Sequence, residues 1–358
     1  MSSELPLVSI VVPAYNAEPF LRASLDSIVG QTYPATEILL MDDASTDATQ
    51  TIACSYGQRI TYHRQPRNLG QFANVNDGIS RARGKFIAVY HADDIYLPEI
   101  VACEAAFLEA HPEAGAVFAI EIFIDREARE RGRLVLPPEV RGRELLDYAT
   151  ALNALLCYKN RIFCGPSSMV PASVYRAVGP YRGHDFPVAG DFEMFFRIAR
   201  QYPVGILDQH LLRYRWGHGN ADQLDRLLRT SPEPYFSIMD EHLATGGRAL
   251  ASNSSLAAHE AHRCEDALMR AVSCYILRRP QEFRPILAEV SLPRLLASNK
   301  VQRYRLSVLY LLLLLLARLP HFPLAARLFR KRWYSRVEDS VFDKMARARI
   351  NVQRAPEA

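Results

Sequence analysis

Two adjacent carboxylates, Asp93 and Asp94, follow the run KFIAVY at residues 85–90, and His91 stands two positions before the first of them. Like charges at the end of a buried strand repel each other and resist desolvation unless a cation or hydrogen-bond donors compensate them. A divalent metal ion that holds a phosphorylated ligand is one solution, because hard oxygen ligands suit Mg²⁺ and Mn²⁺. The alternative is an acidic surface turn that caps the following helix.

Other strand-like runs of the first hundred residues also end in polar residues. The run LVSIVVP at residues 7–13 contains the first expected strand, after which Pro13, Ala14, Tyr15 and Asn16 follow, and the run TEILLMDD ends in two aspartates. Helix-like stretches separate the runs, at residues 17–34, 44–57 and 68–84. Strand and helix alternate without hairpin signals, which predicts an α/β nucleotide-binding fold with parallel strands joined by crossovers.

The position of these polar clusters has a common consequence. Ligands of open parallel sheets bind beyond the carboxyl ends of the strands. The residues after the first run, the Asp42–Asp43 pair and the Asp93–Asp94 pair would therefore meet at one edge of the sheet. Unrelated surface turns would have no reason to share that edge.

Further elements are expected along the chain. A strand is expected within AGAVFAIEIFID at residues 114–125, an exposed connection at residues 131–142, and a helix that starts at Asp191. In the stretch 44–57, Ser45 or Thr46 would cap a helix. Beyond about residue 222 only helix-like segments with proline-containing breaks follow.

Composition limits the class of protein. With 358 residues, 49% of them hydrophobic and 23% charged, the chain is long enough for one large core or two domains. The N-terminus lacks the basic region of a signal peptide, which favours the cytoplasm. The cysteines form no CxxC pair and no metal-ligand spacing, so we expect small buried thiols at all six positions: Cys54, Cys103, Cys157, Cys164, Cys264 and Cys274.

The C-terminal tail is basic and apolar. Residues 301–358 hold 12 Lys and Arg against 4 Asp and Glu, within a chain of net charge +4. The most apolar stretch, residues 306–317, would form a helix of about 18 Å, too short for a hydrocarbon core of about 30 Å. Residues 303–336 have the composition of an interfacial helix on anionic lipid. A buried helix of a C-terminal domain or a homodimer interface is the alternative.

Four motifs in this order resemble the family 2 glycosyltransferases, which have a nucleotide-sugar-binding GT-A fold. They are VSIVVPAYNAEPFLRASLDSIVGQTYP, EILLMDDASTDAT, NLGQFANVNDGISRARGKFIAVYHADDIYLP and GDFEMFFRIA, within about residues 7–217. The resemblance implies a mostly parallel sheet flanked by helices and followed by a C-terminal helical region. We therefore expect a GT-A domain over residues 1–221 and a helical region over residues 222–358.

The resemblance assigns donor-binding roles near the first strands. Tyr15 would pack against the nucleobase, usually uracil, in a pocket that Pro13 and Ala14 line. Asp43 would accept a hydrogen bond from the base's ring N–H, because an ionised carboxylate is a pure acceptor. The alternatives are a core or rim aromatic for Tyr15 and a helix cap for Asp43. The residues Asn68, Gly70 and Asn76 would shape the wall of the donor pocket.

The same resemblance makes Asp93 and Asp94 part of an acidic cluster that coordinates Mg²⁺ or Mn²⁺ and holds the ribose and diphosphate of the donor. Many family members read Asp-x-Asp-Asp here, and this chain has His91 in place of the first acid. A histidine is able to ligate Mn²⁺ or to donate to a phosphate oxygen. A strand-end histidine without such a role is the alternative.

The motif AGDFEMFF would supply the general base. Asp191 matches the carboxylate that deprotonates the acceptor hydroxyl in inverting members, a role worth roughly 10²–10⁴ in rate. Glu193 is the rival, although it would point about 200° away on a helix of ~3.6 residues per turn. A helix N-cap is the other alternative for Asp191. In YRWGHGN, Arg215 and His218 would lie near the donor diphosphate, with His218 as a metal or phosphate contact or as a loop residue without a role.

The sequence thus predicts an inverting, metal-dependent transferase. It would move a sugar from a UDP-sugar to a glycan or lipid-linked acceptor in cell-surface polysaccharide or glycoconjugate synthesis, at the inner face of the cytoplasmic membrane. An inactive GT-A scaffold is one alternative, although the chain keeps Asp94 and Asp191. A nucleotidyltransferase is another, although the loop PAYNAEPF lacks glycine. No nucleic-acid recognition module is present in the sequence.

Overall fold

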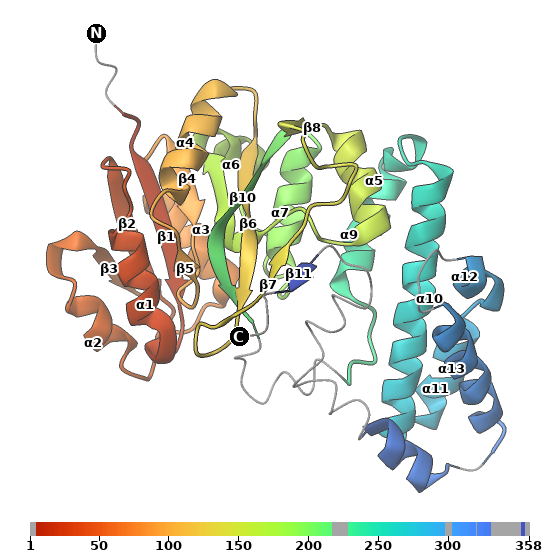
Figure 1. The fold of residues 1–358 in the computed structure, drawn as a ribbon. Helices are drawn as coiled ribbons and strands as arrows, with labels where there is room; N and C mark the ends of the chain where they lie inside the picture. The colour runs from red at the N-terminus through yellow and green to blue at the C-terminus, as the bar shows by residue number, and fades with distance from the viewer. Residues whose placement is uncertain (1–4, 217–227, 298–302, 320, 331–351, 355–358) are drawn as a thin grey trace. The chain divides into compact units, whose positions relative to one another are not determined.

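The computed structural model describes residues 5–216, 228–297, 303–319, 321–330 and 352–354. The chain divides into two compact units (Figure 1). The first unit consists of Met1–Ala151 and Asn160–Gly217, and the second consists of Leu152–Lys159 and His218–Ala358. The domain boundary expected between residues 221 and 222 falls outside the described residues and stays a prediction.

The first unit is built on a sheet whose N-terminal half is parallel. Strand β1 pairs in parallel with β2 on one side and with β4 on the other, and β2 continues to β3. Residues Val8 to Val12 are fully buried, as the continuous apolar run predicts for a central parallel strand. The bounds of these strands are β1 (Val8–Ala14), β2 (Thr36–Asp42), β3 (Thr61–Arg64) and β4 (Phe86–Val89).

Antiparallel strands complete the sheet next to β4. Strand β9 pairs antiparallel with both β4 and β6, and β6 pairs antiparallel with β7 and in parallel with the long strand β10. Strands β5 and β8 add to β10. The bounds are β5 (Ile95–Tyr96), β6 (Ala116–Ile124), β7 (Glu130–Leu134), β8 (Leu145–Leu146), β9 (Ser168–Pro171) and β10 (Val204–Arg215). The expectation of an exposed connection over residues 131–142 is therefore wrong at its start, where β7 continues the sheet.

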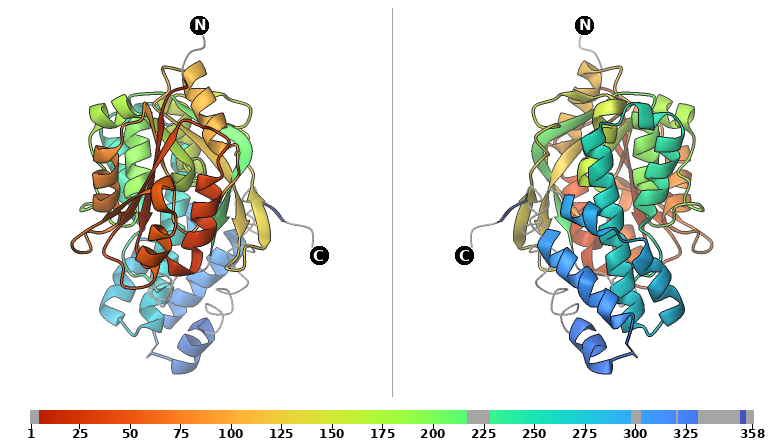
Figure 2. Two further views of the ribbon diagram at one scale, coloured as in Figure 1. Left: turned by 90° about the vertical axis from the view of Figure 1, so that its left-hand side faces the viewer. Right: turned by 90° about the vertical axis from the view of Figure 1, so that its right-hand side faces the viewer.

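Helices cover both faces of this sheet (Figure 2). On one face α1 buries Leu21, Leu25 and Ile28, the positions that recur at helical spacing in the sequence. On the other face α3 approaches so closely that a Cβ on Gly78 would lie 2.5 Å from Val11. The helices are α1 (Glu18–Val29), α2 (Thr49–Cys54), α3 (Gln71–Arg81), α4 (Ile100–Ala110), α5 (Tyr148–Tyr158), α6 (Ala172–Val178) and α7 (Gly190–Ala199), with short 3₁₀ turns η1 (Gly57–Arg59) and η2 (Gly165–Ser167). This arrangement confirms the predicted α/β class.

Helix α2 begins later than expected. Neither Ser45 nor Thr46 caps it, because the first helical residue is Thr49 and the N-cap is Ala48. The carboxylate of Asp47 accepts the Thr49 N–H at 3.0 Å instead. Ser45 and Thr46 instead form hydrogen bonds with Asn16 in the loop after β1.

The second unit consists mainly of helices, as the sequence predicts beyond residue 222. Its described core packs Leu268 and Val272 of α10 against Leu287, Leu295 and Leu313 of the following helices. No described helix is long and apolar enough to cross a membrane. The elements are α9 (Pro234–Ala244), η3 (Gly247–Ala249), α10 (Asn253–Ile276), α11 (Pro280–Ala288), α12 (Leu292–Ala297), α13 (Arg303–Leu316), a helical stretch at residues 323–330 and β11 (Val352–Arg354).

The cysteines correct one expectation. All six are free thiols, as the absence of any pairing pattern predicts. Only Cys264 and Cys274 are buried, however, and Cys54 is exposed at the end of α2. The local sequence did not reveal this because α2 is short and turns only one face to the core.

Candidate active site

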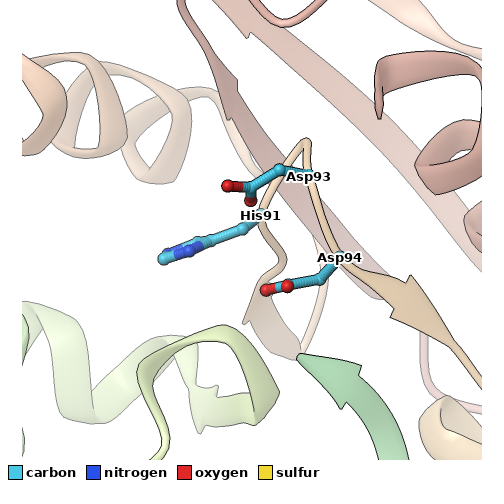
Figure 3. Close-up of side chains that lie close together, drawn as sticks. All are labelled: His91, Asp93 and Asp94. Atoms are coloured by element: carbon cyan, nitrogen blue, oxygen red, sulfur yellow. The ribbon is translucent and has the colours of Figure 1, made fainter. Parts of the chain in front are cut away.

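His91, Asp93 and Asp94 gather just beyond the carboxyl end of β4 (Figure 3). Their metal-binding atoms all lie within 4.8 Å of one another. The loop that carries them is anchored by the preceding residue, because Tyr90 is fully buried and its ring stacks on that of Tyr96 at a centroid distance of 4.1 Å. The spacing suits a divalent cation that takes one imidazole nitrogen and two carboxylate oxygens.

Asp94 shows that this cluster is incomplete without a ligand. One of its oxygens, Oδ1, accepts the backbone N–H of Arg215 at 2.7 Å. The other, Oδ2, is buried and has no hydrogen-bond partner in the part of the chain that the structure describes. Burial, with the neighbouring Asp93 charge second, raises the pKa of Asp94 well above its usual range. A buried unpaired oxygen is costly, and a cation or a donor group would remove that cost. The donor set therefore fits Mg²⁺ or Mn²⁺.

Arg215, the last residue of β10, holds the acidic loop in place. Its Nε donates to the backbone carbonyl of Asp93 at 2.8 Å. Its Nη1 donates to the carbonyls of Asp125 at 2.8 Å and Arg126 at 2.7 Å. The guanidinium also lies over the ring of Phe20 at 4.7 Å. These contacts give Arg215 a positioning role, and its expected contact with the donor diphosphate stays a prediction.

Asp191 lies in the first turn of α7, close enough to His91 for their charges to interact. Its Oδ2 rests against Gly165, where an added Cβ would lie only 2.8 Å away, so this residue must be small. Its Oδ1 accepts the N–H of Phe192 at 2.8 Å. Burial raises the pKa of Asp191, and the Phe192 N–H and the nearby His91 act in the opposite direction. The N-cap of α7 is Ala189, so the helix-cap alternative for Asp191 is wrong.

Glu193, the rival base, has a different environment. It is 1% exposed and forms ion pairs with Arg182 at 2.9 Å and Arg197 at 2.8 Å. These two ion pairs hold the Glu193 carboxylate against its arginines. Asp191 stays the predicted base.

Known proteins resemble this chain over much of its length. Residues 9–179 match the model of glycosyl transferase family 2. An uncharacterized glycosyltransferase of Haemophilus influenzae is 31% identical over 219 residues, which cover 60% of this chain and 67% of that protein. The chain belongs to glycosyl transferase family 2. An uncharacterized glycosyltransferase of Methanocaldococcus jannaschii is 29% identical over 244 residues, or 65% of this chain and 78% of that one.

A solved structure shares the fold of this family 2 chain. The crystal structure of Staphylococcus aureus TarS 1–349 in complex with UDP-GlcNAc superposes with a TM-score of 0.52 and 17% identity, covering 94% of this chain and 92% of TarS 1–349. The GT-A architecture expected from the sequence is thus present. Three curated glycosyltransferases of Rickettsia species also match, and this chain spans 34%, 64% and 64% of their lengths.

In this family 2 chain the end of β1 differs slightly from the prediction. Pro13 and Ala14 lie within β1, opposite Met41 and Asp42 of β2, and not in the loop after it. The first loop residue is Tyr15, which is 52% exposed. The core alternative for Tyr15 is therefore wrong, and its ring is accessible at the edge where the polar clusters meet.

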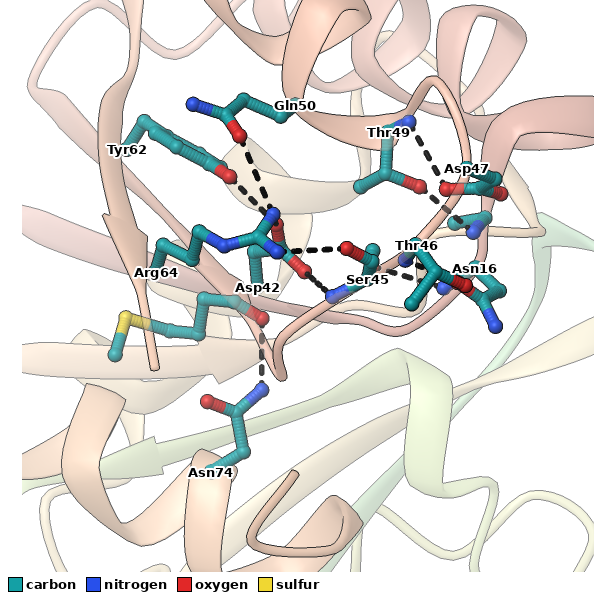
Figure 4. A network of polar contacts seen from close by, with 12 residues as sticks. Asn16, Asp42, Ser45, Thr46, Asp47, Thr49, Gln50, Tyr62, Arg64 and Asn74 are labelled. Atoms are coloured by element: carbon teal, nitrogen blue, oxygen red, sulfur yellow. Dashed lines mark hydrogen bonds and ion pairs between the residues drawn. The ribbon is translucent and has the colours of Figure 1, made fainter. Parts of the chain in front are cut away.

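A hydrogen-bond network anchors the loop that carries Tyr15 (Figure 4). The backbone N–H of Asn16 donates to the hydroxyl of Ser45 at 2.9 Å, and the Asn16 Oδ1 accepts the Thr46 N–H at 2.8 Å. Asn16 has a φ of 49°, a left-handed conformation that asparagine tolerates. The loops after β1 and β2 are therefore held together as one rim.

Asp43 and Asn68 support a neighbouring turn. Both Asp43 oxygens accept backbone N–H groups, from Leu69 at 2.7 Å and from Gly70 at 2.9 Å. The Asn68 Oδ1 also accepts the Gly70 N–H at 3.0 Å, and Gly70 has a φ of 86° that favours glycine. Asp43 caps no helix, so that alternative is wrong. Its contact with a base stays a prediction.

Asn76 and His218 are the two remaining residues that the sequence predicts for the site. The Asn76 amide donates to the Tyr181 carbonyl at 3.0 Å and accepts the Tyr181 N–H at 2.9 Å, so it braces two segments, and its expected place in the wall of the donor pocket stays a prediction. His218 lies outside the described residues. The sequence analysis also missed Glu121, a single acid within the apolar run of β6 that was visible as an exception to that run.

Proposed function

We propose that this chain transfers a sugar, with inversion, from a nucleotide diphosphate donor to a hydroxyl of a glycan or lipid-linked acceptor. The observation that carries the proposal is the unpaired, buried Oδ2 of Asp94 beside His91 and Asp93, with Asp191 close to the same histidine. A site for an anionic leaving group and a separate carboxylate base are the two parts that such a transfer requires.

Asp93, Asp94 and His91 are the residues that would hold a divalent cation. When bound, Mg²⁺ or Mn²⁺ offsets the negative charge that develops on the departing nucleoside diphosphate. Arg215 keeps the acidic loop in register through the Asp93 carbonyl and the Asp94 carboxylate. Asn76 would support the wall of the donor pocket by holding the Tyr181 backbone through two hydrogen bonds.

Asp191 would act as the base. As the acceptor oxygen attacks the anomeric carbon, the proton of that hydroxyl passes to the Asp191 carboxylate. The bond between the anomeric carbon and the diphosphate oxygen breaks, and its electron pair leaves with the nucleoside diphosphate. A single displacement of this kind inverts the anomeric configuration. Partial burial makes Asp191 a better proton acceptor than an exposed aspartate.

The nucleobase would bind against Tyr15, Pro13, Ala14 and Asp43. The exposed ring of Tyr15 offers a stacking surface. An ionised carboxylate has about four lone-pair sites, so Asp43 is able to accept a base N–H beside its two backbone donors. A UDP-sugar is the first donor class to test, because TarS was crystallised with UDP-GlcNAc.

The second unit would bring the enzyme to a membrane surface. Helix α13 exposes Val308, Leu311, Leu312 and Leu315, and basic side chains such as Arg318 follow it. An exposed apolar stripe with arginines at its ends fits the boundary between acyl chains and anionic headgroups. We infer a peripheral position on the inner face of the cytoplasmic membrane. A lipid-linked acceptor and a role in cell-surface polysaccharide or glycoconjugate synthesis fit that position.

Donor hydrolysis by the purified chain tests the proposal. A panel of nucleotide sugars is incubated with Mn²⁺, Mg²⁺ or EDTA, and nucleotide release is measured for the wild type and for Asp94→Ala. We expect release from one donor that EDTA abolishes and that Asp94→Ala loses. The exposed Asp185→Asn serves as the matched control and should keep the wild-type rate. The absence of both turnover and calorimetric donor binding, for every donor in the panel, would contradict the proposal.

A further inference from the structure

A small cavity lies in the first unit beside β6. Its volume is about 30 Å³, and both polar and apolar residues line it. A space of this size holds one or two water molecules, so it also has room for a single hydroxyl group. The lining residues that matter here are Glu121, Leu134, Arg161, Phe163 and Cys164.

Glu121 is the chemically distinctive residue of this cavity. Its backbone lies in β6 opposite Leu212 of β10. Its Oε2 is sealed from solvent and has no hydrogen-bond partner among the described residues. Burial raises the pKa of Glu121 to about 7, and its own backbone N–H and then Arg161 act against the rise. A hydroxyl group is able to donate to the ionised form or to accept from the protonated form.

The cavity adjoins both parts of the reaction centre. Cys164 lines it, and the next residue, Gly165, is the one against which the Asp191 carboxylate rests. The Glu121 charge is close enough to contribute to the raised pKa of Asp94. The chain from Cys164 onward runs alongside β6, since the Ser167 hydroxyl donates to the Ala119 carbonyl at 2.7 Å. Glu121 therefore lies near both the proposed metal ligand and the proposed base.

We propose that this cavity binds one hydroxyl of a sugar during transfer and that Glu121 determines which sugar is accepted. The inference rests on the proposed function. A buried carboxylate oxygen without a partner costs stability unless a ligand satisfies it, and a sugar offers the hydroxyl donors that would do so. The apolar lining residues Leu134 and Phe163 and the small volume disfavour a charged or bulky substituent. Both the transferred sugar and the acceptor sugar present hydroxyls close to the anomeric carbon.

Two substitutions at one position test the inference. Glu121→Leu removes the acceptor and relieves a buried charge, so it should fold at least as well as the wild type. Glu121→Gln keeps an acceptor oxygen. With the nucleotide sugar that turns over best, we expect Glu121→Leu to lose roughly 10- to 100-fold in kcat/KM and Glu121→Gln to recover much of that loss. The exposed Glu113→Gln is the control and should match the wild type.

Monodeoxy analogues identify the source of the hydroxyl. If it belongs to the transferred sugar, one deoxy donor will be hydrolysed equally slowly by wild type and Glu121→Leu, without any acceptor present. If it belongs to the acceptor, hydrolysis will stay unchanged, and transfer to p-nitrophenyl glycosides will fall in Glu121→Leu alone.

Two results would overturn the inference, and they differ in what else they overturn. Unchanged hydrolysis together with unchanged transfer in a folded Glu121→Leu would refute the hydroxyl site and leave the proposed function intact. A wild-type chain that hydrolyses no nucleotide sugar would refute the proposed function first, and this inference with it.

Discussion

The two units differ in some of their buried carboxylates. In the described part of the first unit, Asp94, Glu104 and Glu121 each have a buried carboxylate oxygen without a hydrogen-bond partner, although Glu193 is paired with two arginines. In the second unit, the buried Asp266 lies between Arg229 at 2.6 Å and Arg270 at 2.8 Å. Buried acceptors with room for a further donor are what a ligand-binding site requires.

The units also differ in where apolar side chains are exposed. The exposed large apolar residues of the first unit are scattered along the chain, at Leu5, Tyr15, Leu69 and Val188. In the second unit they cluster on α13 and the segment after it, where Val308 is 66% and Leu311 is 53% exposed. Single exposed apolar residues are ordinary, whereas a cluster marks a surface for an apolar partner. Under the proposed function, the first unit carries the chemistry and the second unit the attachment.

The largest expected effect concerns the base in the first unit. Asp191→Asn removes the proton acceptor and keeps the shape of the side chain, so we expect transfer to fall by roughly 10²–10⁴. Donor binding, measured by calorimetry, should change little because Asp191 lies on the acceptor side of the proposed reaction. The exposed Asp185→Asn is the matched control. An active Asp191→Asn would move the base to another residue.

The same type of substitution should act oppositely on stability in the two units. Asp266→Asn leaves Arg229 and Arg270 without their shared carboxylate, and we expect a loss of about 3 kcal/mol in the free energy of unfolding. Asp94→Asn removes a buried, incompletely paired charge and keeps an oxygen for the Arg215 N–H, so stability should stay equal or rise. Urea unfolding of both variants measures this. A loss in both would show that the two sites are alike.

Mild acid should separate the units further. Burial, with Arg263 second, lowers the pKa of His259 in the second unit to about 4. Below pH 6.5, the ordinary pKa of histidine, His259 binds a proton in the unfolded chain but stays neutral in the folded chain. The free energy of unfolding therefore falls by up to about 3 kcal/mol as the pH drops to 4. Glu121 in the first unit works in reverse: its raised pKa gives stability that is full below 4.5 and lost as the pH rises through 7.

Variants isolate these two contributions. In urea unfolding between pH 7 and pH 4, His259→Gln should lose stability less steeply than the wild type, and Glu121→Gln should gain less. The side chain of His184 is fully exposed, so His184→Gln is the control and should follow the wild-type curve. A His259→Gln curve parallel to the wild type would show that folding does not change the pKa of His259.

The smallest expected effect concerns attachment. Leu311→Ser should weaken binding to vesicles that contain anionic lipid by roughly tenfold, since full burial of a leucine is worth about 1.5–3 kcal/mol and α13 buries its face only in part. Vesicle sedimentation measures it. Leu250→Ser changes an exposed leucine elsewhere in the second unit and should have no effect. Equal binding of all three proteins would leave α13 as a surface for another protein chain.

The sequence determined the parts that depend on local pattern. The apolar runs and their spacing predicted β1, β2 and β4, the helices between them, and the clusters at Asp43, Asp93 and Asp94, because hydrophobic period and chain order fix which strands are parallel and where they end. The family resemblance added Asp191, whose motif lies in one short stretch. The late start of α2 and the position of Pro13 within β1 were small errors at element boundaries.

Only the tertiary structure decided how distant residues satisfy one another. Arg215 donates to an aspartate 121 residues earlier, Asn76 pairs with Tyr181 at a separation of 105, and the Glu121 cavity is closed by residues 160–164. Local sequence carries no record of such partners, because strand register and loop closure choose them from many polar groups of similar type. For the same reason, the sequence shows only that Glu121 is an acid in an apolar run. The fold shows that its Oε2 is buried and has no hydrogen-bond partner among the described residues.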